Sequence, residues 1–158
     1  MTVVNIHASC VVLAKAGALF GAPSDGGVLL LGESGAGKSS VVLKLLALGA
    51  MLVADDRVDL FVRDESLYAT APAPLAGLIE ARGLGIVKLP HAAESRVALA
   101  VALGPAPPRY PDREDYEPPT PLNVRAKPPL FRLSAEDMAV AEKIVLAAAA
   151  FSNALFRQ

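Results

Sequence analysis

Residues 32–40 read GESGAGKSS and decide the fold, because they join two apolar segments of different character. The preceding residues 28–31, VLLL, are typical of a strand that is buried on both faces. The following residues 38–48 carry apolar side chains at helical spacing and end at Gly49, a residue type that often stands just beyond a helix. A glycine-rich turn between a strand and a helix directs backbone N–H groups and the positive helix end at one point, where a phosphate can bind.

The stretch matches the full pattern G-x-x-x-x-G-K-[ST] of a phosphate-binding P-loop, or Walker A motif. Gly32, Gly35 and Gly37 allow the backbone to turn its N–H groups inward. Lys38 supplies a mobile positive charge for the β and γ phosphates, and Ser39 supplies a hydroxyl for Mg²⁺. A chance glycine turn is the competing interpretation, and the flanking strand and helix disfavour it. The predicted phosphate-binding residues are Gly32, Glu33, Ser34, Gly35, Ala36, Gly37, Lys38, Ser39 and Ser40.

Composition limits the protein to a few broad classes. The 158 residues are 53% hydrophobic and carry a net charge of −1, from 15 basic and 16 acidic side chains. We expect one domain over residues 1–158, with no nucleic-acid or membrane partner. No stretch reaches the roughly 18 apolar residues of a membrane span, and the N-terminus lacks the basic residues that begin a signal peptide. The single cysteine, Cys10, is consistent with a cytoplasmic protein.

The rest of the chain predicts an α/β domain with a mixed β-sheet. Short apolar runs, such as residues 51–54 and 96–103, are typical of buried strands. Residues 105–129 contain nine of the thirteen prolines and are predicted to form a long surface loop. Residues 134–157 are predicted to form a C-terminal helix that begins with Ser134 in a capping box.

Two adjacent carboxylates, Asp55 and Asp56, follow the predicted strand at residues 51–54. A carboxylate at the end of a strand beside the P-loop can hold Mg²⁺ through water, as a Walker B aspartate does. Alternation along the strand would point the two side chains to opposite sides, so at most one would face the γ-phosphate. The alternative is a solvated turn in which Arg57 pairs with one of the acids.

The segment GLIEARGLGI lies within residues 74–89, which we predict to begin as a helical turn and to pass through Gly83 and Gly85 into a strand. Glu80 and Arg82 lie two residues apart, so on an extended segment they would share a face. An acid for a metal and a guanidinium for a phosphate would then enter one site together. A surface ion pair explains the same spacing.

The segments GESGAGKSS, LVADDRVDL and LIEARGLGI, in this order and at this spacing, resemble the catalytic domain of bacterial HPr kinase/phosphorylase. IHAS at residues 6–9 resembles the family's His-Gly segment, with Ala8 where a glycine is usual. The resemblance runs from about residue 5 to about residue 116 and is to the short form found in some proteobacteria. It implies an HPr-kinase-like, PEP-carboxykinase-like fold, with one P-loop domain, a mixed β-sheet and a C-terminal helix.

The same resemblance implies how the nucleotide and its metal would be held. The phosphates of ATP would lie on residues 32–39, and Mg²⁺ would be bound by Ser39 and Glu80. Lys38 and Arg82 would stabilise the charge on the transferred phosphate.

The resemblance also implies the residues that carry out the transfer. One aspartate, for which we prefer Asp56 over Asp55, would take the proton from a protein serine, and His7 would lie near the transferred phosphate. Arg113 corresponds loosely to a further phosphate-site arginine of the family. Apart from the resemblance, a histidine between short strands, such as His7, is more often a packed or surface residue than a catalyst, and Arg113 is equally explained as a solvated loop charge.

Together these features predict a cytoplasmic, Mg²⁺- and ATP-dependent kinase that phosphorylates a serine of an HPr-like phosphocarrier protein. The resemblance further implies a homo-oligomer, by analogy a hexamer. Residues 124–133, VRAKPPLFRL, stand where longer relatives carry a glycine-bearing dephosphorylation loop, so whether the chain is also a phosphorylase stays open. The alternatives are a non-catalytic nucleotide-binding sensor module of a phosphotransferase system, and a small-molecule kinase or hydrolase. The Asn-Lys-x-Asp motif of GTPases is absent from the sequence.

Overall fold

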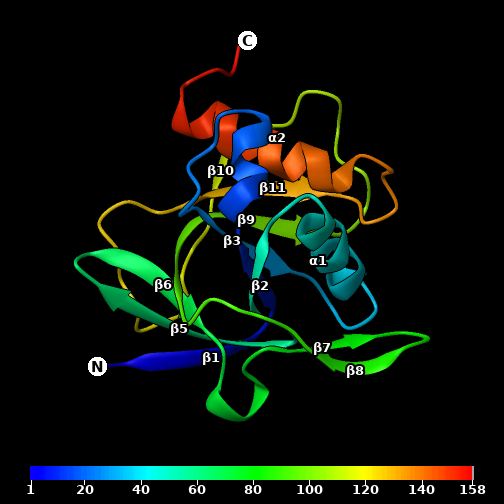
Figure 1. Cartoon of the computed structure of the whole chain (residues 1–158). Helices are drawn as coiled ribbons and strands as arrows, with labels where there is room; N and C mark the ends of the chain where they lie inside the picture. The colour runs from blue at the N-terminus through cyan, green and yellow to red at the C-terminus, as the bar shows by residue number, and fades with distance from the viewer. Residues whose placement is uncertain (158) are drawn as a thin grey trace.

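The computed structural model describes residues 1–157 and is built around a nine-stranded sheet, with a separate two-stranded ribbon formed by β7 and β8 (Figure 1). The strand order along the sheet is β1-β5-β6-β9-β3-β2-β4, and β11 joins β9 and β10. The strands of the large sheet are β1 (Val3–His7), β2 (Ser9–Val12), β3 (Gly27–Leu31), β4 (Met51–Ala54), β5 (Arg57–Arg63), β6 (Ser66–Thr70), β9 (Ser95–Leu103), β10 (Glu114–Asp115) and β11 (Pro129–Leu133).

The strands at the centre of the sheet form both parallel and antiparallel pairs. β3 pairs parallel with β9 and antiparallel with β2. β11 also runs parallel to β9, whereas the other strand pairs of the large sheet are antiparallel. The predicted mixed sheet is therefore confirmed. Val28, Leu29 and Leu30 of β3 are fully buried, as their uninterrupted apolar run predicted.

Helical segments cover one face of the sheet: α1 (Lys38–Ala47), α2 (Val140–Ser152) and the short 3₁₀ helix η1 (Ala14–Leu19) (Figure 1). Each α-helix turns one apolar stripe toward the sheet, as an amphipathic surface helix does. The helix that follows the glycine-rich stretch is thereby fixed against the strand that precedes it. The main buried side chains of the two helices are Val41, Val42, Leu45, Ile144 and Val145.

The proline-rich segment at residues 105–129 forms the predicted surface loop, because most of it is exposed, and a few of its side chains pack on the opposite face of the sheet. Alternate residues of β3 separate the two faces, because Val28 and Leu30 belong to the helical core and Leu29 to the second core. Tyr116, a half-buried residue of the segment, packs against that second core. Proline removes backbone donors and prevents longer strands than the two residues of β10. Some apolar side chains between the prolines are nevertheless half-buried against this core.

The C-terminal helix is shorter than the predicted range of residues 134–157, because α2 occupies only Val140–Ser152. Ser134 Oγ accepts a hydrogen bond from the N–H of Glu136 at 3.2 Å, and Asp137 Oδ1 accepts one from the N–H of Ala139 at 2.8 Å. Local side-chain bonds of this kind compete with helical ones. The predicted capping box is therefore wrong, and its polar residues form turns that precede the helix.

The segment at residues 74–89 forms a hairpin, whereas we predicted a strand only after the glycines. A short 3₁₀ turn, η2 (Ala73–Leu75), precedes β7 (Leu78–Ala81), which pairs antiparallel with β8 (Gly85–Lys88). Gly83 and Gly85 have φ of +89° and +105°, a conformation that permits the tight reversal.

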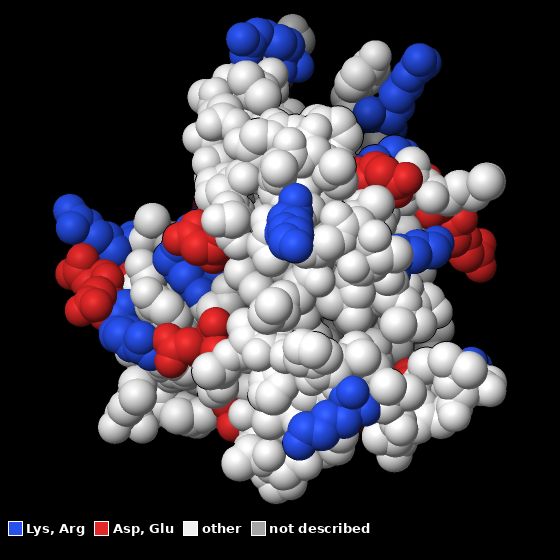
Figure 2. Space-filling model, in the orientation of Figure 1, with Lys and Arg blue, Asp and Glu red and all other residues white. Residues whose placement is uncertain are grey.

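Charged side chains are unevenly distributed over the visible surface. Figure 2 shows acidic and basic groups interspersed at the edge formed by β5 and β6, and a largely uncharged area over α1 and α2. Within residues 1–157, no helix is long and apolar enough to span a membrane.

Gly27, at the start of β3, has no room for a side chain. A Cβ there would lie 2.3 Å from the carbonyl oxygen of Arg96 and 2.6 Å from Ser95 Oγ. Because this backbone belongs to the central strand pair, we expect Gly27→Ala to lower the free energy of unfolding by about 1–3 kcal/mol, measured by chemical denaturation. Gly104→Ala is the matched control, since a Cβ there meets open space. Equal stability of the two variants would contradict this account of the packing.

Candidate functional site

The glycine-rich loop, residues 32–37, connects the end of β3 to the start of α1. Gly35 and Gly37 have φ of +85° and +93°, and α1 has no side-chain cap at its N-terminus. Successive N–H groups therefore face the same space, to which the positive end of the helix also points. In the described part of the chain, several of these N–H groups have no hydrogen-bond partner, among them those of Gly35, Gly37, Lys38 and Ser39. The loop fits a phosphate group.

The Lys38 side chain lies over the glycine-rich loop. Its Nζ donates to the carbonyl oxygens of Gly32 at 2.6 Å and Glu33 at 3.1 Å, and lies 3.2 Å from His7 Nε2. The residue is buried, with 6% exposure. Burial lowers the pKa of Lys38 from its ordinary value, and the nearby charges of Asp56 and Asp55 act in the opposite direction. The site thus holds a desolvated cation beside the free N–H groups.

Ser39 and Asp55 form the part of the site that fits a metal ion. Ser39 Oγ donates to Asp55 Oδ1 at 3.1 Å and lies 3.3 Å from Asp55 Oδ2, and Asp55 is buried with 6% exposure. A hydroxyl and a carboxylate are oxygen ligands, which Mg²⁺ prefers. In residues 1–157 no group of three or more His, Cys, Asp or Glu side chains could hold a metal ion. The donor set fits Mg²⁺ that takes its other oxygens from phosphates and water, as this ion commonly does.

Asp56 and His7 form the more exposed part of the site. His7 Nδ1 lies 3.3 Å from Asp56 Oδ1, and the Asp56 side chain is 68% exposed. His7 Nε2 faces the ammonium of Lys38, which can only donate, so we assign the imidazole proton to Nδ1, from which it is donated to Asp56. Ser34 Oγ lies 3.4 Å from the same Nε2. A contact chain therefore runs from Lys38 through His7 to an accessible carboxylate.

The side chains of the two aspartates point in different directions, but not because of the strand alternation that we predicted. β4 ends at Ala54, so neither carboxylate lies within a strand. Asp56 has φ of +70°, in the left-handed region, which turns its side chain toward His7 while that of Asp55 meets Ser39. Backbone conformation, and not strand alternation, separates them.

The structure does not bring every predicted site residue to the glycine-rich loop. Glu80 and Arg82 are exposed on and beside β7, whose Ile79 packs into the core with α1. Among the residues described, neither side chain has a hydrogen bond or ion pair to Ser39 or Asp55. The Arg113 guanidinium lies 5.3 Å from the ring centre of Phe151, on α2. The roles of these three residues stay predictions.

Ser9 was missed by the sequence analysis. It is buried, with 1% exposure, and its hydroxyl bonds to Asp55 and to the backbone of Asp56. The only sequence signal is a small hydroxyl residue in the apolar strand SCVV, next to IHA.

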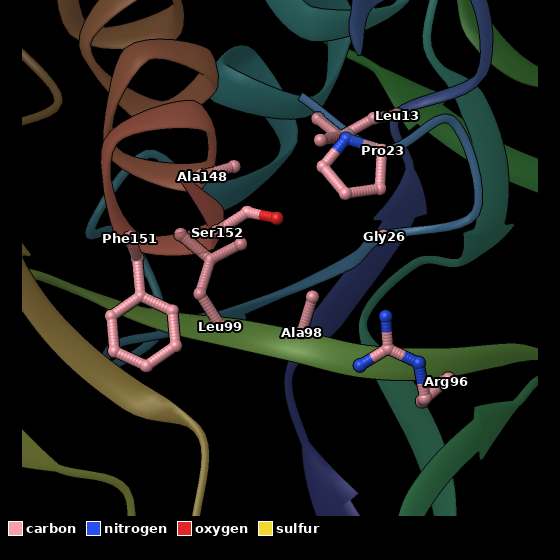
Figure 3. A pocket seen from close by; sticks show the side chains of 9 residues that line it. All are labelled: Leu13, Pro23, Gly26, Arg96, Ala98, Leu99, Ala148, Phe151 and Ser152. Carbon is pink, nitrogen blue, oxygen red and sulfur yellow. The ribbon is translucent and has the colours of Figure 1, made fainter. Parts of the chain in front are cut away.

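A cavity of about 130 Å³ lies at the other end of β3 (Figure 3). It is mostly apolar, with the Arg96 side chain at one side, and contains no residue of the predicted phosphate site. This cavity is therefore separate from the glycine-rich loop. The cavity is lined by Leu13, Pro23, Gly26, Arg96, Ala98, Leu99, Ala148, Phe151 and Ser152.

The fold and the site define a class: a mixed-sheet α/β protein in which a glycine-rich loop joins a buried strand to an uncapped helix, beside a serine, a lysine and two aspartates. Within this class, the chain belongs to the HPr Serine kinase C-terminal domain family, which matches residues 13–94. The predicted family and the predicted fold class are both confirmed.

Individual relatives agree with this assignment. The chain is 52% identical over 62 residues to the HPr kinase/phosphorylase of Limosilactobacillus reuteri, a match that covers 39% of this chain and 19% of that protein. It is 53% identical over 62 residues to the HPr kinase/phosphorylase of Lactobacillus delbrueckii subsp. bulgaricus, with 39% and 20% coverage. The matched segment therefore spans about a fifth of these curated relatives.

A solved structure extends the similarity of fold to almost the whole chain. The Hpr(Ser) kinase/phosphatase from Coxiella burnetii superposes with a TM-score of 0.72 at 22% identity. The superposition covers 96% of this chain and 99% of that one.

Proposed function

We propose that this chain is a Mg²⁺- and ATP-dependent protein-serine kinase of the HPr kinase/phosphorylase type, acting on an HPr-like phosphocarrier protein. One observation carries the proposal: the accessible carboxylate of Asp56 lies in contact with His7, which contacts Lys38 of the glycine-rich loop. An exposed carboxylate next to a phosphate-binding loop is suited to take a proton from an incoming hydroxyl. Family membership supports the same assignment.

The nucleotide-binding half of the site would use residues 32–40. Unpartnered N–H groups and the Lys38 ammonium would bind the phosphates of ATP, and Ser39 and Asp55 would hold Mg²⁺. Bound Mg²⁺-ATP supplies the phosphoryl group and neutralises charge during transfer. Glu80 would contribute to metal binding, and Arg82 and Arg113 to charge stabilisation, as the resemblance implies.

The transfer half of the site would use Asp56 and His7. Asp56 would accept the proton of the acceptor serine as the serine oxygen forms its bond to the γ-phosphorus. The bond from that phosphorus to the β-phosphate oxygen breaks, and ADP leaves. His7 would orient Asp56 through Nδ1 while Nε2 contacts Lys38. In a reverse, phosphorylase reaction the protonated Asp56 would act as the acid.

We also propose that the protein is cytoplasmic and self-associates, as a hexamer by analogy with the family. The largely uncharged surface over α1 and α2 supports self-association (Figure 2), and so do the exposed apolar side chains of Leu43 on α1 and Leu146 on α2. Light scattering at several concentrations measures the assembly, and a monomer at all of them would contradict this part of the proposal.

Transfer of label from γ-labelled ATP tests the proposed kinase directly. The purified chain, Mg²⁺ and an HPr-like phosphocarrier should give acid-stable label on a serine, since phosphohistidine would be lost in acid. The phosphocarrier with that serine changed to alanine is the control. Binding of ATP without any label on the phosphocarrier would contradict the kinase and favour the non-catalytic sensor module.

Glu80→Gln tests the predicted metal ligand. The substitution keeps the size of the side chain and removes its charge, so we expect a higher Mg²⁺ requirement for ATP binding and little change in binding without metal. Calorimetric titration of ATP at several Mg²⁺ concentrations measures this effect. Glu142→Gln is the matched control, because Glu142 is also an exposed acid and lies on α2. An unchanged Mg²⁺ requirement would make Glu80 an ordinary surface acid.

A further inference from the structure

Ser9 is a polar residue enclosed in an otherwise apolar part of the core. Its neighbours Ala8 and Cys10 are fully buried, and Ser9 itself is 1% exposed. A buried hydroxyl without hydrogen-bond partners would destabilise the fold. The hydrogen bonds of Ser9 therefore explain why this residue is tolerated in the core.

The Ser9 hydroxyl makes one hydrogen bond to each member of the aspartate pair. It donates to Asp55 Oδ1 at 2.8 Å and accepts the backbone N–H of Asp56 at 3.2 Å. A hydroxyl has one proton to donate, so the bond to the Asp55 carboxylate uses it, and an oxygen lone pair serves Asp56. The two aspartates are thus bound to a single atom through different groups.

The strand register explains why Ser9 reaches both residues. His7 pairs with Arg57 and Cys10 with Ala54, so the residues between them, Ala8 and Ser9, lie opposite the two aspartates. The N–H of Ala8 donates to the carbonyl oxygen of Asp56 at 3.2 Å. The N–H of Asp56 bonds to the Ser9 side chain in place of a ladder partner, and Asp56 itself has a φ of +70°.

This left-handed conformation is unfavourable for a residue with a side chain, and asparagine and aspartate tolerate it best. It persists where surrounding bonds over-determine it. Ser9 satisfies the displaced N–H and at the same time fixes the preceding carboxylate against Ser39, 3.1 Å away. Both carboxylate positions therefore depend on one hydroxyl.

We propose that Ser9 is a positioning residue that assigns the two aspartates to different tasks, Asp55 to the metal and Asp56 to the proton of the acceptor. The inference rests on the proposed kinase function for Asp56. Its part concerning Asp55 requires only that Mg²⁺-ATP binds.

Ser9→Ala removes the hydroxyl and adds no new group. Groups that orient a metal ligand typically account for about 10–100-fold in metal affinity or activity. We expect the Mg²⁺ concentration that half-saturates ATP binding to rise by about 10–100-fold, and kcat for serine phosphorylation to fall by about the same factor. The KM for the phosphocarrier should stay within about twofold, because no acceptor contact is removed.

Two further variants separate positioning from general packing. Ser9→Thr retains the hydroxyl and should recover the Mg²⁺ requirement of the natural protein, whereas Ser9→Cys retains the size but offers only a weak S–H donor and should not. Ser95→Ala is the matched control, because Ser95 is also buried and its hydroxyl bonds to the Arg96 carbonyl oxygen, away from the site. It should lose stability without a change in Mg²⁺ requirement.

An unchanged Mg²⁺ requirement and kcat in folded Ser9→Ala would overturn the proposal, as would equal changes in Ser95→Ala. If the natural chain binds Mg²⁺-ATP but transfers no phosphate, the kinase proposal fails, and the role of Ser9 toward Asp56 fails with it. The calorimetric Mg²⁺ titration of Ser9→Ala still decides its role toward Asp55.

Discussion

Replacing Asp56 with asparagine is expected to lower the rate of serine phosphorylation by about 10²–10⁴-fold, the usual contribution of a general base. The amide keeps the size of the side chain but cannot accept a proton at neutral pH. ATP binding should be retained, because Asp56 contacts His7 and not Ser39. The measurement is kcat from label transfer, together with a calorimetric Kd for ATP.

Asp55→Asn is the matched comparison for that experiment, since it changes the neighbouring residue in the same way. Asp55 contacts Ser39, so its substitution should raise the Mg²⁺ requirement of ATP binding and thereby slow transfer. High Mg²⁺ should restore part of the activity of Asp55→Asn and none of the activity of Asp56→Asn. If Asp56→Asn kept the natural rate, this aspartate would not be the base. A loss in Asp55→Asn that Mg²⁺ did not relieve would then assign that role to Asp55.

Lys38→Ala is expected to lower phosphate transfer by about 10²–10³-fold, the effect of removing one preorganised donor from a developing charge. ATP affinity should also fall, because the ammonium is the only buried cation among the described residues of the site. The N–H groups of the glycine-rich loop remain, so some binding should persist.

Lys44→Ala controls for the loss of a lysine from the same helix, because Lys44 is exposed on α1. Both variants are compared by label transfer and by ATP titration. Natural activity in Lys38→Ala would mean that the glycine-rich loop is not where ATP binds.

The central part of the fold follows from local sequence patterns. An uninterrupted apolar run became the buried strand β3, and helical spacing after Lys38 became α1. These elements are predictable because the residues that define them are adjacent in the chain. The strand β11 was not predicted, since PLFRL begins with a proline that follows another proline, and it has little alternation of its own. Its strand conformation comes from pairing with β9, a contact between distant residues.

In the candidate site too, only features formed by residues adjacent in the chain could be predicted. The glycine-rich loop is complete within one short segment, and its geometry was expected from that segment alone. The positions of the Asp55 and Asp56 side chains, in contrast, depend on a left-handed backbone residue and on the side chain of Ser9, which lies opposite them in another strand. Propensity at single positions carries no information about such a partner. For this reason sequence reasoning found the acids but missed the residue that holds them.

The pairing of β3 with β9 has a consequence for how the protein is made. Leu30 lies beside Val101 in the finished sheet, so a long stretch of chain separates the two sides of this pair. Contacts between distant residues form late, because a large loop must first be closed. A nascent chain that has left the ribosome only as far as α1 already contains the whole glycine-rich motif, yet the strand that leads into it lacks its parallel neighbour. Affinity for nucleotide should therefore arise only after residues 95–103 have been synthesised. Folding intermediates in which β3 and β9 are not yet paired should not bind ATP.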